Sequence, residues 1–256
     1  MKVSIITLTF NSEKTILRCI KSINNQSHKN IEHIIIDGCS KDNTLTIINT
    51  NKKSQSIVVS EEDDGLYHAW NKGINLASGD IIGTVMSDDY LKNNYVINDI
   101  VNTFISNQCD IVYGDMDFVF EGEIIRKWKA GIFKKYKYYF GWMPPPPTVY
   151  MKKEIFKNNK LFNTKYKIGA DYEFYLRIFF LNNYKIFYLD KFLYTLEYGG
   201  ISNKSLKNIY DGNMENYQAW KDNNISKLPF WVPMKPFFKI FQIKNIRSFF
   251  SFYFRR

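Results

Sequence analysis

This 256-residue chain has few cysteines, few histidines and no long apolar run. Its cysteines, Cys19, Cys39 and Cys109, are odd in number and form no C-x-x-C pair, so neither a disulfide framework nor a cysteine metal site is predicted. We expect reduced thiols of the kind found in the cytoplasm.

Segments for membrane insertion or export are also missing. No stretch reaches the roughly 18 uninterrupted apolar residues that a spanning helix needs. The apolar run that follows Lys2 is short and breaks at Asn11 and Glu13, so no signal peptide is predicted.

Several catalytic signatures are absent as well. No P-loop occurs and no G-x-G-x-x-G follows the first predicted strand, which counts against kinases, NAD enzymes and most methyltransferases. A bound diphosphate would therefore have to be held by a metal ion. His28, His33 and His68 form no Ser-His-Asp arrangement, and the first two are interpreted as structural.

What the chain does contain is typical of an ordered enzyme. Hydrophobic residues make up 45% and aromatic residues 17% of it, unlike a disordered chain. Its length suits one large domain with a short appendage. We predict a domain over residues 1–226, with parts at 1–110 and 111–226, and a separate tail over residues 227–256.

The hydrophobic periodicity predicts an α/β fold. Four β-rich runs alternate with helical patterns, at 3–10, 16–23, 31–36, 44–51, 57–60, 66–77 and 81–86. This rhythm favours a doubly wound, mostly parallel sheet with helices on both faces. Further on we predict a strand, a hairpin, an extended proline loop, a helix, a strand and a helix, at 110–114, 121–123, 144–147, 171–182, 185–189 and 205–221.

Polar residues follow each of the first four predicted strands. They are Asn11, Asp37, the acidic run 61–64, and Asp88 with Asp89. Parallel strands place their carboxyl ends at one edge, where ligands bind in such folds. The alternative is chance, since Asp favours turns. Adjacent carboxylates such as Asp88 and Asp89 suit a hard divalent cation that also binds phosphate oxygens.

These motifs together resemble the family-2 glycosyltransferases with the GT-A fold, in particular the bacterial surface-polysaccharide branch of the O-antigen and colanic-acid type. The motifs run in the order Ile5–Asn11, Asp37–Thr44, Asp64–Tyr67, Asn71–Gly73, Gly79-Asp80, Ser87–Asp89 and Gly169–Glu173. The resemblance implies a metal-dependent, nucleotide-sugar hexosyltransferase, with the nucleotide-sugar-binding part in residues 1–110 and the acceptor-binding part in residues 111–226.

The resemblance also implies which residues bind the donor. These are Thr9, Phe10, Asn11, Asp37, Asp64, Lys72 and Asp88. Phe10 matches the aromatic residue that stacks on the base, Asp37 the carboxylate that accepts from the base N–H, and Asp88 the ribose contact. Trp70 stands where the family often has Arg. Lys72 is therefore either its substitute or a solvated helix residue.

For the chemistry, the resemblance implies Asp89 as the ligand of Mn²⁺ or Mg²⁺ and Asp171 as the general base. An acceptor hydroxyl attacks C1 of the sugar while the nucleoside diphosphate leaves, so catalysis needs a base on one side and positive charge on the other. A single in-line displacement predicts inversion at C1. Without the family match, the sequence alone favours Asp171 as a helix cap or a first-turn acid.

The tail, residues 227–256, has seven Lys or Arg, ten aromatic residues and no acidic residue. This composition is typical of helical segments that lie at a membrane surface, and it predicts a protein that is cytoplasmic and peripheral at the inner face of the cell membrane. The alternative is that the aromatic residues pack on the catalytic domain. No RNA-binding signature accompanies them, so nucleic acid is not expected as a partner.

The resulting hypothesis is an inverting transferase in O-antigen (lipopolysaccharide) assembly. It moves a hexose, of glucose or galactose type, from a UDP-sugar to a saccharide carried on a polyprenyl diphosphate. Two alternatives remain: a sugar nucleotidyltransferase, and a catalytically inactive membrane-associated scaffold.

Overall fold

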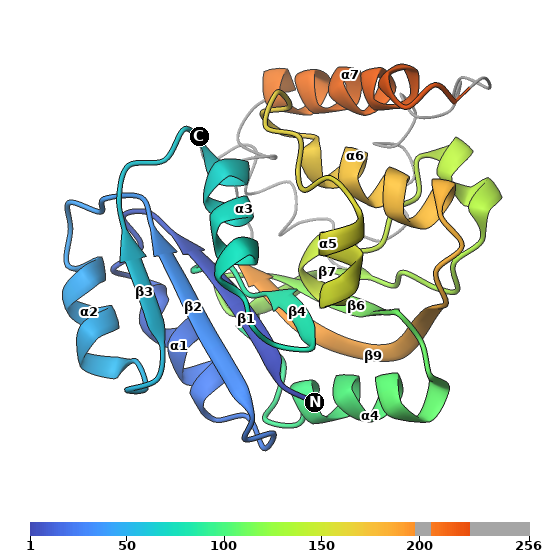
Figure 1. The fold of residues 1–256 in the computed structure, drawn as a ribbon. Helices are drawn as coiled ribbons and strands as arrows, with labels where there is room; N and C mark the ends of the chain where they lie inside the picture. The colour runs from blue at the N-terminus through green and yellow to red at the C-terminus, as the bar shows by residue number, and fades with distance from the viewer. Residues whose placement is uncertain (198–205, 226–256) are drawn as a thin grey trace.

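The computed structural model describes residues 1–197 and 206–225, which form an α/β fold around one large sheet (Figure 1). The sheet has nine strands in the order β3-β2-β1-β4-β8-β6-β9-β5, with β7 paired to β6. It runs through both predicted parts of the domain, so residues 1–110 and 111–226 share one framework.

The first half supplies a parallel unit. Its elements are β1 (Val3–Thr9), α1 (Ile16–Asn24), β2 (Ile31–Asp37), α2 (Thr44–Asn51), β3 (Ile57–Ser60), α3 (Leu66–Leu76) and β4 (Ile81–Thr84). Strands β3, β2, β1 and β4 are all parallel, as the strand and helix rhythm predicts. Their carboxyl ends therefore lie at one edge of the sheet, called here the carboxyl edge.

The second half adds antiparallel pairs. Its elements are β5 (Tyr90–Leu91), α4 (Val96–Asn107), β6 (Ile111–Phe120), β7 (Glu123–Trp128), η1 (Lys135–Phe140), η2 (Pro146–Thr148), β8 (Tyr150–Lys152), α5 (Lys153–Asn158), α6 (Ala170–Tyr175), η3 (Leu176–Leu181), β9 (Ile186–Glu197) and α7 (Leu206–Asp222). Strand β8 is antiparallel to both β4 and β6, whereas β6 and β9 are parallel to each other.

Helices cover both faces of the sheet, and each face has its own apolar core (Figure 1). On one face α3, α5, α6 and α7 contribute buried side chains such as Trp70, Tyr172 and Trp220. On the other face α1, α2 and α4 contribute Ile20, Ile48 and other aliphatic side chains. The doubly wound arrangement is confirmed, because side chains pointing to either face of β1 are fully buried.

Several predicted elements need correction. The proline run is not wholly extended, since Pro146–Thr148 form a turn of 3₁₀-helix whose first positions tolerate proline. The predicted helix at 171–182 begins at Ala170 and continues from Leu176 as a π-helix. Helix α4 was not predicted. The tail, residues 227–256, lies outside the described residues.

Gly73 lets helix α3 approach strand β1 closely. A Cβ on Gly73 would lie 2.5 Å from Cγ2 of Ile6, a side chain buried in β1. Gly73→Ala should therefore lower the free energy of unfolding by about 1–3 kcal/mol, since the overpacking cost exceeds the gain in helix propensity. Asn75→Ala, at an exposed position of the same helix, should be neutral or stabilising. Urea denaturation of the two variants measures both effects, and equal midpoints would contradict the predicted close packing.

Candidate active site

A row of polar side chains crosses the carboxyl edge. The strand register places Thr9 beside Asp37, and Asp37 beside Ser60. Because directly opposed residues of neighbouring strands point to the same face, these three side chains share one face of the sheet. Thr9 is 6% exposed and its Oγ1 has no hydrogen-bond partner.

Asp37 is enclosed in this row and is fully buried. Its Oδ1 accepts a hydrogen bond from the Ser40 hydroxyl at 2.5 Å, and its Oδ2 accepts from the Ser60 hydroxyl at 2.6 Å and the Ser40 amide at 3.1 Å. Both carboxylate oxygens are therefore engaged in holding the loops after β2 and β3. The base contact that the family match implies for Asp37 stays a prediction.

Phe10 and Asn11 form the rim of the same edge. The Phe10 ring is 61% exposed, which is unusual for a large aromatic side chain and leaves a ring face available for stacking. Asn11 has a φ of +48°, a left-handed conformation that Asn tolerates better than most residues. Its backbone amide donates to the Ser40 hydroxyl oxygen at 2.8 Å, and its side-chain Oδ1 accepts from the Lys41 amide at 2.8 Å. Asn11 thus joins the loops after β1 and β2.

The turn after β4 carries Asp88 and Asp89. The Ser12 and Ser87 hydroxyls lie 2.9 Å apart and join this turn to the loop after β1. Arg18 of α1 donates to the Asp88 carbonyl at 3.0 Å and stacks over the Tyr90 ring at 4.3 Å. The turn is therefore held from two sides while its carboxylates remain available.

Negative charge at this turn is poorly compensated. Burial raises the pKa of Asp89 well above its usual range, and the charge of Asp88 raises it further, while Arg18 opposes the shift. Burial likewise raises the pKa of Asp88. Arg18 is itself paired with Glu197, at 2.8 Å. Raised carboxyl pKa values in a loop cluster are a recognised mark of a functional site.

The donor set of this turn fits a divalent cation. Asp89 is 2% exposed, and its Oδ1 is buried without a hydrogen-bond partner. Within residues 1–197 and 206–225, no three His, Cys, Asp or Glu side chains gather as a complete metal cage. One or two carboxylates completed by substrate phosphates is the usual arrangement for Mg²⁺.

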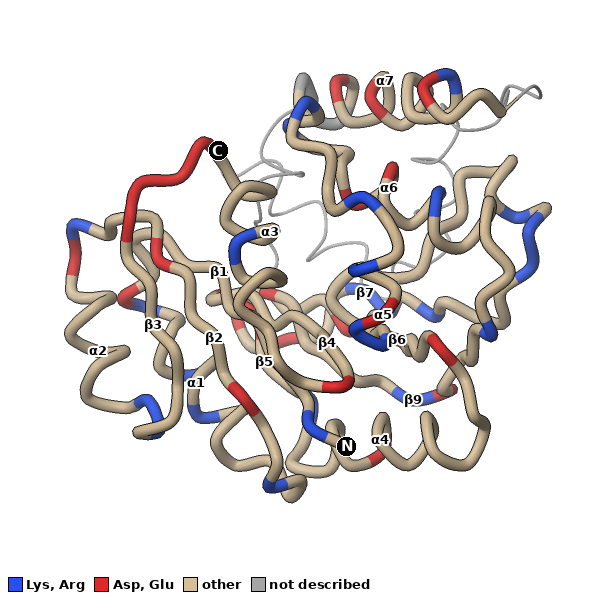
Figure 2. The backbone as a smooth tube through the Cα atoms, in the orientation of Figure 1, with Lys and Arg blue, Asp and Glu red and all other residues tan. Residues whose placement is uncertain are grey.

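The acidic loop between β3 and α3 is exposed and is continuous in Figure 2 with the start of α3. Asp64 is exposed there, beside Gly65 with a φ of +114°. Lys72 Nζ pairs with Glu61 at 2.5 Å and with Asp63 at 2.7 Å. Burial would lower the pKa of Lys72, but the bonds to Asp63 and Glu61 outweigh it and raise that pKa. Lys72 thus offsets part of the negative charge of this loop, and a phosphate would compete with two carboxylates for it.

Asp171 lies in the first turn of α6, on the other side of the start of α3. It is half-buried, and its Oδ1 accepts from the Tyr172 amide at 2.7 Å. The Tyr67 hydroxyl is 3.5 Å from the same oxygen. Tyr67 lies in the first turn of α3, shortly after the acidic loop. Asp171 therefore lies beside the start of α3.

The two acidic centres lie near different apolar cores of the sheet. Tyr67, the neighbour of Asp171, belongs to the apolar core under α3 and α6. Asp89 acts electrostatically on Cys19 and Tyr194, which belong to the core on the other face. The structure thus joins Asp88 and Asp89 to the loops after β1 and β2, and joins Asp171 to α3.

Sequence reasoning missed several residues that build this edge. They are Ser12, Arg18, Ser40, Ser60, Tyr67, Ser87 and Glu197. Ser40, Tyr67 and Ser87 lie inside the motifs and could have been noted. The position of Arg18 beside Asp88 depends on the packing of α1 and leaves no sequence signal. Trp70 and Asn71 have a structural part, because Asn71 exchanges two hydrogen bonds with the Phe162 backbone, at 2.9 and 3.0 Å.

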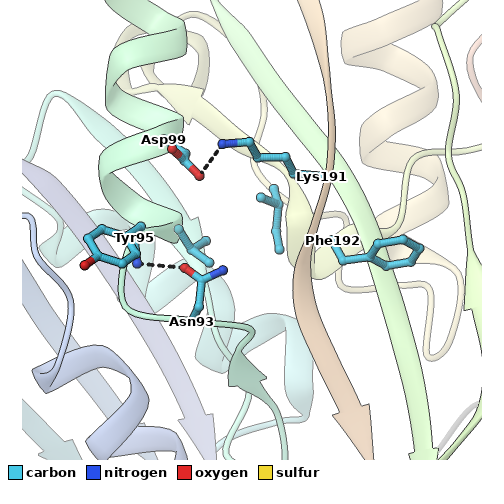
Figure 3. A pocket seen from close by; sticks show the side chains of 7 residues that line it. Asn93, Tyr95, Asp99, Lys191 and Phe192 are labelled. Carbon is cyan, nitrogen blue, oxygen red and sulfur yellow. Dashed lines mark hydrogen bonds and ion pairs between the residues drawn. The ribbon is translucent and has the colours of Figure 1, made fainter.

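A separate cleft of ≈ 480 Å³ lies between β9 and the start of α4 (Figure 3). It is lined by Asn93, Tyr95, Val96, Asp99, Lys191, Phe192 and Leu193. Lys191 and Asp99 are paired across it at 2.8 Å. None of the predicted site residues lines this cleft, so it is not part of the candidate site.

The chain belongs to glycosyl transferase family 2, whose family model matches residues 4–179, more than half of its length. It is therefore a nucleotide-sugar glycosyltransferase. The matched residues include both Asp89 and Asp171 and stop within η3. The alternative of a sugar nucleotidyltransferase is accordingly set aside.

Relatives agree with this assignment. A PGL/p-HBAD biosynthesis glycosyltransferase of Mycobacterium bovis is 28% identical over 210 residues, covering 78% of each chain. Staphylococcus aureus TarS 1–349 has a TM-score of 0.65 at 23% identity, covering 86% of this chain and 65% of that one. The chain thus spans less than two thirds of the TarS fragment. A mannosyltransferase of Pyrobaculum calidifontis, solved with GDP-Man and Mn²⁺, has a TM-score of 0.63 at 15% identity, covering 91% of this chain and 68% of that one.

These likenesses confirm the α/β GT-A fold. They leave the O-antigen branch of the family untested. Among the helices of the described residues, none has the length and apolar character needed to cross a membrane.

The raised pKa of Asp89 predicts that ionised Asp89 lowers the free energy of unfolding. Because the folded state binds this proton more tightly than the unfolded chain, stability falls as the pH rises from about 3.8, the usual Asp value, through the folded pKa. Without metal at neutral pH, Asp89→Asn should therefore raise Tm, by about 2–4 °C for each kcal/mol relieved. Thermal melts between acidic and neutral pH test this, with Asp211→Asn on α7 as control. A Tm below wild type at every pH would contradict it.

Proposed function

We propose that this glycosyltransferase moves a hexose from a UDP-sugar, with inversion at C1, to a saccharide linked to polyprenyl diphosphate in surface-polysaccharide assembly of the O-antigen type. The observation that carries the proposal is the composition of the carboxyl edge. The exposed Phe10 ring and the adjacent Asp88 and Asp89, whose carboxyl pKa values burial raises, follow β1 and β4 at this edge, and Asp171 at the start of α6 lies beside Tyr67 of α3. Each matches a need of sugar transfer.

We propose UDP as the donor nucleotide, although the mannosyltransferase was solved with GDP-Man. Two of the TarS structures hold UDP and UDP-GlcNAc, although at 22% and 20% identity they support the fold and only suggest the donor. In this chain the nucleobase of the UDP-sugar would stack on Phe10, and Asp88 would accept a hydrogen bond from a ribose hydroxyl. Thr9 Oγ1, buried and without a partner, is a further polar group that a nucleotide could satisfy.

Asp89 would hold the metal ion, Mn²⁺ or Mg²⁺, with Asp88 beside it. The cation supplies positive charge that stabilises the leaving diphosphate. The unpartnered Oδ1 of Asp89 fits this part, because a buried carboxylate oxygen without a donor is costly unless a ligand satisfies it. A mannosyltransferase of the same fold was solved with Mn²⁺.

Asp171 would take the proton of the acceptor hydroxyl. It stands on the first turn of α6, close to the start of α3 and half-exposed, so an acceptor arriving over the second half of the chain can reach it. Its Oδ1 accepts a hydrogen bond from the Tyr172 amide within the first turn of α6.

Asp171→Asn should leave UDP affinity unchanged and lower transfer by about 10²–10⁴-fold, the usual contribution of a general base. Calorimetry measures UDP affinity in the presence of Mn²⁺, and transfer is measured from radiolabelled UDP-glucose or UDP-galactose to a bacterial membrane lipid extract. Asp211→Asn serves as the matched control. Transfer near the wild-type rate in Asp171→Asn would refute the base assignment.

The protein would bind its lipid-linked acceptor at a membrane surface. The tail, residues 227–256, supports this by its composition. A basic segment among the described residues supports it as well: residues 124–153, which include η1, contain no Asp or Glu (Figure 2). There Ile132 is 67% and Tyr136 56% exposed, with exposed Lys134 and Lys135 beside them. Exposed apolar side chains among lysines suit an anionic membrane surface.

Deleting residues 228–256 should release the protein from anionic vesicles. Lys134→Gln with Lys135→Gln should weaken binding by about 2 kcal/mol, at ~1 kcal/mol per lysine. Lys14→Gln with Lys29→Gln removes the same charge from exposed positions elsewhere and should have little effect. Sedimentation with phosphatidylglycerol vesicles measures all three. Full binding by the truncated protein would contradict the role of the tail.

A further inference from the structure

The turn that precedes Asp171 is held by a carboxylate from a distant helix. Glu215 of α7 accepts hydrogen bonds from three successive backbone amides, those of Lys167 at 3.0 Å, Ile168 at 2.9 Å and Gly169 at 2.7 Å. Hydrogen bonds to an ionised acceptor are stronger than neutral ones, so this contact fixes the backbone of the turn directly.

Gly169 allows this close approach of α7. A Cβ at residue 169 would lie 3.0 Å from Oδ1 of Asn216 and 3.2 Å from Cβ of Glu215. The φ of Gly169 is −102°, which any residue can adopt, so the requirement for glycine comes from space and not from backbone conformation. The backbone of the turn is therefore packed against side chains of helix α7.

Tyr67 of α3 contacts the same turn from the side of the proposed UDP-sugar site. Its hydroxyl donates to the Ile168 carbonyl at 2.6 Å, and the Tyr67 side chain is buried, with 6% exposure. The ring stacks on Trp70, with 6.3 Å between centroids and 4° between planes. Because Tyr67 follows the acidic loop 61–64 and Gly65, its position is tied to the donor side of the carboxyl edge.

The two contacts satisfy complementary groups of one turn. Glu215 takes its N–H groups, and Tyr67 takes its Ile168 carbonyl. We propose that Tyr67 and Glu215 are positioning residues that together set where Asp171 stands relative to the donor. This inference rests on the proposed base role of Asp171. Neither residue needs to touch the substrate: Glu215 acts through the backbone that carries Asp171, and Tyr67 acts through that backbone and through its hydroxyl, 3.5 Å from Asp171 Oδ1.

The chemistry of these groups predicts what each substitution removes. Tyr67→Phe keeps the ring and its packing but loses the donor to Ile168. Glu215→Gln keeps the size but removes the charge, and one of its two terminal groups becomes a donor that cannot accept an N–H. Displacement of a reacting group by about 1 Å can cost up to 10²-fold in rate.

Steady-state kinetics of the full chain with a UDP-sugar tests the inference. Tyr67→Phe and Glu215→Gln should each lower kcat by about ten-fold or more, leaving the donor KM unchanged. Because both act on one turn, the double variant should lose less than the product of the single losses. Tyr217→Phe and Asp211→Asn on α7 are the matched controls and should retain the wild-type kcat.

Unchanged kcat in Tyr67→Phe would overturn the inference, as would a rise in donor KM equal to the fall in kcat. Should Glu215→Gln fail to fold, Tyr67→Phe alone decides, because it keeps the packed ring. The base assignment fails separately, when Asp171→Asn retains transfer. If Asp171→Asn is inactive while Tyr67→Phe is fully active, only the positioning role is wrong.

Discussion

The candidate site depends on negative charge that the protein leaves uncompensated at the carboxyl edge of its sheet. Asp88 and Asp89 are adjacent; burial raises the pKa of both carboxyls, and the charge of Asp88 raises the pKa of Asp89 further. The only cation near them, among the residues described, is Arg18, which is shared with Glu197 and contacts the Asp88 backbone. Such an arrangement weakens the metal-free fold and is typical of a site built to receive a cation.

The surrounding structure keeps this charge in place. Asn11 and Ser12 connect the loops after β1, β2 and β4, so hydrogen bonds join three strand ends. Asp37 is part of the same framework, with both oxygens bonded. The second half of the chain is attached through α3, where Tyr67 and Asn71 bond to the backbone of residues 162 and 168. Helix α3 therefore links the donor edge to the turn that carries Asp171.

Much of the first ninety residues could be predicted from the sequence. The strands β1 to β4 are β-branched runs separated by helical patterns, and their ends carry the acidic motifs, so the parallel sheet and its polar edge follow from local pattern. The family match was confirmed. The second half was harder, because β8 and β5 are only three and two residues long and their pairing is decided by tertiary contacts. Glu215 could not have been found, since its three bonds join residues 46 to 48 positions apart.

The central claim is that a cation at Asp89 and the carboxylate of Asp171 serve one bound donor. A crystal structure of the chain with UDP-sugar and Mn²⁺, with the metal located by its anomalous scattering, tests this most directly. The account predicts a manganese peak in contact with Asp89 and the diphosphate, with the sugar C1 facing Asp171. Manganese bound away from Asp89, or a sugar that Asp171 cannot approach, would contradict it.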